Sequence, residues 1–165
     1  METKLADLQL RFATESDVPL ILEFIKELAA YEHLSNQVSA TEAILKESLF
    51  VRKAAEVIFC EYQGEPVGFA LFFHNFSTFL GKPGIYLEDL YVKPQMRGKG
   101  LGTVIRSFLA RLAVERDCGR LEWWCLDWNE PSVQFYKRMG AVPMEEWTVF
   151  RVCDKALFDL AKKFD

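Results

Sequence analysis

The stretch from Leu87 to Gly102, LEDLYVKPQMRGKGLG, constrains the fold more than any other part of this chain. An apolar segment with two adjacent carboxylates, Glu88 and Asp89, ends at Pro94, and three glycines follow at alternate positions. Glycine permits left-handed backbone conformations and lets a ligand come close to the main chain. A helix that begins after these glycines directs its unpaired N–H groups and a partial positive charge at the turn. The pattern predicts a strand, an anion-binding turn suited to a pyrophosphate, and a helix.

The spacing of the glycines excludes two common phosphate-binding loops. Lys99 is followed by Gly100 instead of Ser or Thr, which rules out a Walker loop. The third glycine comes one position too early for the dinucleotide fingerprint G-x-G-x-x-G. The observed pattern is Gln95-x-x-Gly98-x-Gly100, with Arg97 before the first glycine. It resembles the acyl-coenzyme-A (acyl-CoA) loop of the GCN5-related N-acetyltransferase (GNAT) family.

A second motif lies about thirty residues after the loop. Asn129 precedes a short predicted helix, Phe135 and Tyr136 lie within it, and Gly140-Ala141 follows it. This arrangement resembles the second cofactor-binding motif of the same family. The two motifs have the family's order and separation, and with the predicted order of strands and helices the resemblance covers nearly the whole chain.

Hydrophobic periodicity predicts an alternation of strands and helices along the chain. Capping boxes are expected at Thr14-x-x-Asp17 and Ser39-x-x-Glu42, each before a helix. The expected strands cover 8–12, 57–62, 67–76, 85–92, 121–126 and 148–152, and the expected helices cover 18–31, 42–51, 101 to about 118, 131–139 and a C-terminal segment from about 155. One helical crossover among hairpins implies a mixed α/β sheet in which the strands flanking the glycine loop are parallel. The resemblance implies the GNAT acyl-CoA N-acyltransferase fold: a mostly antiparallel sheet, one parallel pair splayed around the cofactor, and helices on both faces.

Composition narrows the class of protein. The chain has 165 residues, which predicts one domain by length, and the resemblance implies that this single domain over 1–165 is an N-acetyltransferase. Its net charge of −4 argues against nucleic-acid and anionic-membrane partners. No apolar run approaches a membrane span, and the first residues lack a signal-peptide core, so a cytoplasmic location is expected. The four cysteines lack C-x-x-C spacing and only two histidines could join them, so no metal site is predicted.

Acetyl transfer to an amine requires loss of a proton from the ammonium and favours a proton donor for the leaving thiolate. Tyr136 is the candidate donor, because a phenol is protonated at neutral pH. Glu88 is the candidate base, or the carboxylate that holds the amine and passes its proton to water. Asp89 would point to the opposite face of a regular strand, and both carboxylates serve one site only if the strand is distorted there.

The resemblance also implies binding roles for specific residues, with acetyl-CoA as cosubstrate. Backbone groups of the loop and of the preceding strand, and the Asn129 side chain, would hold it, and basic side chains would contact its phosphates. The candidate cofactor-binding residues are Leu90, Tyr91, Val92, Arg97, Gly98, Lys99, Gly100, Leu101, Gly102, Thr103, Asn129, Pro131, Ser132, Tyr136 and Arg138. The candidate substrate-binding residues are Tyr31, Glu32, Glu88, Asp89, Trp123, Trp124 and Glu145. Of the two tryptophans, one is expected in the core and the other at the amine cleft.

Within the family, Tyr31-Glu32, Tyr86-Leu87-Glu88-Asp89 and the segment 128–138 resemble the diamine (spermidine/spermine) and thialysine acetyltransferases. This resemblance implies a homodimer that acetylates a primary amine of a small diamine, polyamine or lysine-like amino acid, by direct attack in a ternary complex. Ser35-Asn36 replaces an acidic pair of the polyamine enzymes, and Ser77 and Phe79 replace an aspartate and a tryptophan. Fewer carboxylates predict a substrate with fewer distal positive charges than spermine.

Two alternatives remain open from the sequence. A non-catalytic acyl-CoA sensor would need only the loop and Asn129, so the presence of both Tyr136 and Glu88 favours an enzyme. An enzyme that acetylates protein or peptide amines would instead have a groove open at both ends.

Overall fold

The computed structural model describes residues 1–164 and divides the chain into two compact units, Met1–Trp124 and Cys125–Asp165. No helix among residues 1–164 is both long and apolar enough to cross a membrane. The expectation of a single domain over 1–165 stays a prediction.

Nearly all of the regular structure belongs to the first unit. Its strands are β1 (Leu8–Phe12), β2 (Glu56–Tyr62), β3 (Glu65–Ser77), β4 (Lys82–Val92) and β5 (Leu121–Trp123), and its helices are α1 (Val18–Tyr31), α2 (Glu42–Lys46) and α3 (Leu101–Glu115). The second unit contains α4 (Glu130–Arg138) and α5 (Asp154–Ala161).

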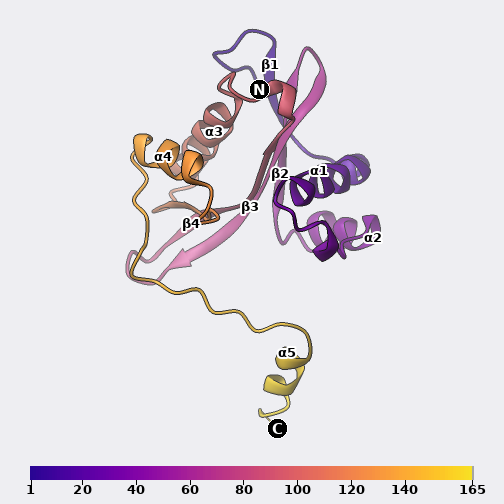
Figure 1. The fold of residues 1–165 in the computed structure, drawn as a ribbon, viewed down its shortest axis with the longest axis vertical. Coiled ribbons are helices and arrows are strands. Elements are labelled where there is room, and N and C mark those ends of the chain that lie inside the picture. Colours follow the sequence, from indigo (N-terminus) through magenta and orange to yellow (C-terminus); the bar gives the residue numbers. More distant parts are fainter. Residues whose placement is uncertain (165) are drawn as a thin grey trace. The chain divides into compact units, whose positions relative to one another are not determined.

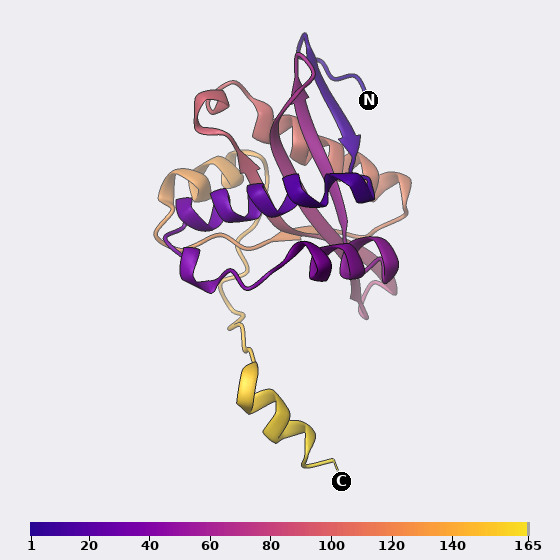
Figure 2. The same cartoon turned by 90° about the vertical axis from the view of Figure 1, so that its right-hand side faces the viewer.

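The five strands form one sheet in the order β1-β2-β3-β4-β5. The first three pairings are antiparallel, and β4 and β5 are parallel because the crossover through α3 connects them. Helices α1 and α2 cover one face of the sheet and α3 covers the other (Figures 1 and 2). The mixed sheet with one parallel pair, predicted from the sequence, is confirmed.

Two apolar cores lie on the two faces of the sheet. On one face, Ile21 and Phe24 of α1 are fully buried with Phe59 and Phe69 of the sheet. On the other face, the buried cluster includes Ile105 and Leu109 of α3. The two core layers fix α1 and α3 on the sheet, and therefore place the C-terminal end of α1 and the N-terminal end of α3 near the end of β4.

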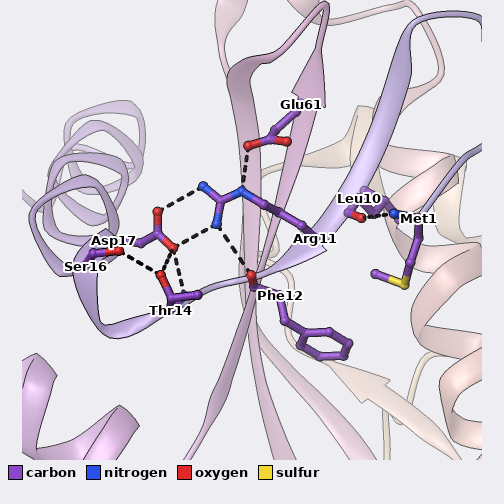
Figure 3. A network of polar contacts seen from close by, with 8 residues as sticks. All are labelled: Met1, Leu10, Arg11, Phe12, Thr14, Ser16, Asp17 and Glu61. Atoms are coloured by element: carbon purple, nitrogen blue, oxygen red, sulfur yellow. Dashed lines mark hydrogen bonds and ion pairs between the residues drawn. The ribbon is translucent and has the colours of Figure 1, made fainter.

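A network around Arg11 connects β1, β2 and the turn before α1 (Figure 3). Arg11 donates to both carboxylate oxygens of Asp17, at 2.8 and 2.9 Å, and to Glu61 at 2.6 Å. The Arg11 hydrogen bonds lower the pKa of Asp17 to about 2, against the opposing effect of burial and with help from Thr14. The capping box predicted at Thr14 and Asp17 is present.

The second predicted capping box is wrong by two residues. Thr41, and not Ser39, is the N-cap of α2, where its hydroxyl accepts the N–H of Ile44 at 3.3 Å. Thr41 directly precedes the helix in an extended conformation, which is the geometry that an N-cap requires. The helix then continues as a π-helix over Glu47–Val51.

Two predicted strands also need correction. The strand expected over 121–126 ends at Trp123, and the strand expected over 148–152 does not form. Alternating apolar residues favour a strand, but a strand is stable only when its backbone groups pair with a neighbour. No strand is described among residues 125–164, so the second unit supplies no such neighbour of its own.

Candidate active site

The glycine loop connects β4 to α3 as predicted. A 3-10 turn over Pro94–Met96 follows the strand, and α3 begins at Leu101. Gly98 and Gly100 have φ values of +76° and +86°, in the left-handed region, where a side chain would be strained. A Cβ atom at Gly98 would meet no other atom within 4 Å, so the space over this residue is open.

The N-terminal end of α3 is suited to an anion. Gly100 is its N-cap and supplies no side-chain hydrogen bond to the first turn. The helix has 15 residues, so its macrodipole adds a partial positive charge at this end. These features fit the pyrophosphate of an acyl-CoA. Gly102 serves a packing need instead, because a Cβ there would lie 3.3 Å from the Arg106 guanidinium.

Arg97 connects the loop to α1, an arrangement that the sequence did not predict. Its Nε donates to the carbonyl oxygen of Val92 at 2.9 Å. Its guanidinium lies over the ring of Tyr31 at 4.4 Å and over that of Tyr91 at 5.5 Å. Lys99 is exposed, with its ammonium 3.5 Å from the sulfur of Met96. The predicted contacts of these two side chains with phosphates stay predictions.

One edge of β4 loses its pairing partner just before the glycine loop. Parallel pairing with β5 covers only Ile85–Leu87, although β4 continues to Val92. From Glu88 onward no strand within residues 1–164 pairs with this edge, while β3 still pairs with the other. The backbone groups of Leu90 and its neighbours are therefore placed to pair with an extended ligand, as expected for the pantetheine arm of acyl-CoA.

Three carboxylates gather where this edge opens. Glu88 is exposed, Asp89 is partly buried in β4, and Glu32 is partly buried just after α1. Burial raises the pKa of Asp89 to about 6, and the negative charges of Glu88 and Glu32 add to the shift. Burial also raises the pKa of Glu32. The charges of this group favour a cation at this end of the site.

Glu88 and Asp89 can serve one site only if β4 is distorted at this point, and the structure shows such a distortion. Leu87 pairs with Phe72 and Asp89 pairs with Leu71, so Glu88 is an extra residue in the ladder. Such a bulge changes the direction of the side chains that follow it. Because of it, the condition under which Glu88 and Asp89 could serve one site is met, and the substrate-binding roles of both stay predictions.

Aromatic side chains lie beside the carboxylates. The ring of Tyr86 is 5.1 Å from that of Phe73 and 5.8 Å from that of Trp124, both between ring centres. Trp124 is 58% exposed, whereas Trp123 packs against the core cluster under α3, with the Arg106 guanidinium 5.8 Å from its ring. Trp123 is therefore the tryptophan at the core, as expected for one of the two, and the place of Trp124 at an amine cleft stays a prediction. The sequence did not single out Phe73.

The second unit contains the other predicted site residues. Asn129 is the N-cap of α4, and its carbonyl accepts the N–H groups of Ser132 and Val133, while its side chain makes no capping hydrogen bond. Pro131 occupies the first turn, and the ring of Tyr136 lies 5.7 Å from that of Phe135. Arg138 ends the helix, and Glu145 lies exposed in the irregular segment 141–153.

Comparison with known proteins agrees with this geometry. The model of the acetyltransferase (GNAT) family matches residues 22–141. The chain belongs to this family. It is 38% identical to thialysine N-epsilon-acetyltransferase of Bos taurus over 96% of this chain and 100% of that protein. It is 30% identical to L-ornithine N5-acetyltransferase of Arabidopsis thaliana over 90% of this chain and 86% of that one.

A solved structure shows the same fold. An integron cassette protein from the mobile metagenome of V. cholerae superposes with a TM-score of 0.79 at 25% identity, and the match covers 96% of this chain and 99% of that one. The GNAT fold and the resemblance to thialysine acetyltransferases are therefore confirmed, and the chain is an N-acetyltransferase. The non-catalytic alternative is set aside. Within residues 1–164 no group of three or more His, Cys, Asp and Glu side chains could hold a metal ion.

Proposed function

We propose that this protein transfers the acetyl group of acetyl-CoA to a primary amine of a small diamine, polyamine or lysine-like amino acid, with short lysine-like molecules preferred. The observation that carries this proposal is the set of carboxylates at the open edge of β4, next to the glycine loop. A substrate with two separated amines can react at one end while the other end contacts Glu32. The two relatives named for thialysine and L-ornithine support this substrate class.

In this proposal, acetyl-CoA supplies an activated acetyl thioester. The residues of the chain orient the two substrates and protonate the leaving sulfur. The loop Arg97–Thr103 and the backbone of Leu90, Tyr91 and Val92 hold the donor. Glu88 and Asp89 bind the ammonium at the open edge, and Tyr136 donates a proton to the leaving sulfur. The amine attacks directly, with both substrates bound. A cytoplasmic location belongs to the same proposal.

The test of the substrate class is a thiol-release screen over amines of graded length and charge. Short diamines and lysine-like amino acids should exceed spermine in kcat/KM, because Ser35, Asn36 and Ser77 supply no distal negative charge. The Glu32→Gln variant should raise KM by about fivefold or more and change kcat little, because a charge-assisted contact contributes about 1–3 kcal/mol to uniform binding. Glu23→Gln, at an exposed position of α1, is the matched control. Spermine as the best substrate, or unchanged kinetics in Glu32→Gln, would contradict the proposed substrate.

We also propose that the protein is a homodimer, as the family resemblance implies. Light scattering at micromolar concentration should give twice the mass of one chain. A mass of one chain, unchanged when acetyl-CoA and an amine are added, would refute this assembly and leave the activity untouched.

A further inference from the structure

We propose that Asp89, and not Glu88, accepts the proton that the substrate ammonium must lose before it attacks the thioester. This inference rests on the proposed function and assigns the base within that site.

The first argument is the face of the sheet on which Asp89 lies. Residues paired directly across an antiparallel ladder have their side chains on the same face. Asp89 pairs with Leu71, which packs against the core cluster under α1, and Tyr86 pairs with Phe73 and contacts its ring. Leu71 and Phe73 are two residues apart and share a face, so Asp89 and Tyr86 do too. Positions three apart share a face only because Glu88 is bulged.

The second argument is the position of Asp89 along the strand. Parallel pairing with β5 ends at Leu87, so Asp89 is the second residue of the open edge. Leu90 and Tyr91, which follow it, have the backbone groups that an extended ligand would pair with. A thioester held on this edge would lie close to Asp89, whose carboxyl also feels the charge of Glu32.

The third argument is the environment of the two carboxylates. Glu88 is exposed, and water competes there with a substrate for its charge. Asp89 is partly buried, and Glu88 and Glu32 are the charged groups that act on it. Tyr91 lies further along the same face. Burial and Glu27 raise the pKa of its hydroxyl, and Arg97 lowers it. Burial and its two acidic neighbours raise the pKa of Asp89 to about 6, which makes it a stronger base that is still ionised at neutral pH.

The protons and electrons of the step balance as follows. Asp89 takes one proton from the ammonium, which frees the nitrogen lone pair to bond to the acetyl carbon. The bond from that carbon to sulfur breaks, its electron pair stays on sulfur, and Tyr136 supplies the sulfur with a proton. The second proton lost by the nitrogen goes to water, and water restores Tyr136. Asp89 then releases its proton to solvent, so each turnover releases one proton.

The experiment is the pH profile of kcat/KM for a short diamine in the wild-type protein and in three variants. The wild-type profile should fall on the acid side near pH 6, where Asp89 becomes protonated. Asp89→Asn should lower kcat by about a hundredfold or more and abolish this acid limb. Asp89→Glu should restore part of the rate together with an acid limb.

Glu88→Gln gives a second test that does not depend on the stability of the Asp89 variants. It should keep the acid limb but move it to lower pH, because removing a neighbouring negative charge lowers the pKa of Asp89. If Glu88 were the base, this variant would lose the limb altogether. Loss of the limb in Glu88→Gln, or a wild-type rate and limb in Asp89→Asn, would overturn the assignment.

A melting-temperature shift with CoA separates the two proposals. Asp89→Asn should keep the shift, because the loop is unchanged. A wild-type protein that binds CoA and acetylates no amine would overturn the proposed function and this inference with it. Amine acetylation combined with a wild-type profile in Asp89→Asn would overturn this inference alone.

Discussion

Replacing Tyr136 by Phe should lower kcat by about a hundredfold or more while CoA binding stays unchanged. The substitution removes one hydroxyl and keeps the ring that lies against Phe135. General acid catalysis contributes typically 10²–10⁴-fold, and the thiolate would leave here without a positioned proton. The measurement is steady-state thiol release with a short diamine, together with the melting-temperature shift on addition of CoA.

Tyr62→Phe is the matched control, because Tyr62 ends β2 on the hairpin and has no part in the proposed chemistry. It should retain wild-type turnover. A fall of less than about threefold in Tyr136→Phe, which corresponds to about 0.7 kcal/mol of barrier, would contradict the role of this hydroxyl as proton donor.

Replacing Gly100 by Val should abolish the stabilisation by CoA. Gly100 has a φ of +86°, which a β-branched residue adopts only with strain. Among the described residues, the nearest atom to a Cβ at this position is a side-chain carbon of Leu5 at 3.9 Å, which is an ordinary van der Waals contact. The effect of the substitution should come from a changed loop backbone and from side-chain atoms placed where the pyrophosphate would approach.

Gly64→Val separates this effect from simple loss of stability. Gly64 lies in the turn between β2 and β3 with a φ of +84°, and a Cβ there would also meet no atom closely. It should lower the melting temperature by a similar amount but keep the shift with CoA. Retention of CoA affinity in Gly100→Val would refute the assignment of the loop. ATP and NAD should shift the melting temperature of the wild-type protein little, because the loop has neither the Walker pattern nor the dinucleotide fingerprint.

The sequence by itself determined the strands and helices whose signals are local. The turn at Gln63-Gly64, the capping box at Thr14 and the glycines of the loop each depend on the conformations that single residues allow. The β2–β3 hairpin, α1, the loop and α3 could therefore be predicted within a few residues. The loop and the second motif together also indicated the family, because their spacing is specific.

Features that depend on a partner distant in sequence were decided only by the tertiary structure. The segment 148–152 alternates like a strand, but alternation does not supply the neighbour that a strand needs, and none is described in its unit. The contact between Arg97 and Tyr31 arises because the sheet holds α1 beside the end of β4, which no local pattern encodes. The bulge at Glu88 depends on the register of β3 against β4. Register is a property of two strands together, so the sequence named both carboxylates and only the paired sheet decided that Asp89 shares a face with Tyr86.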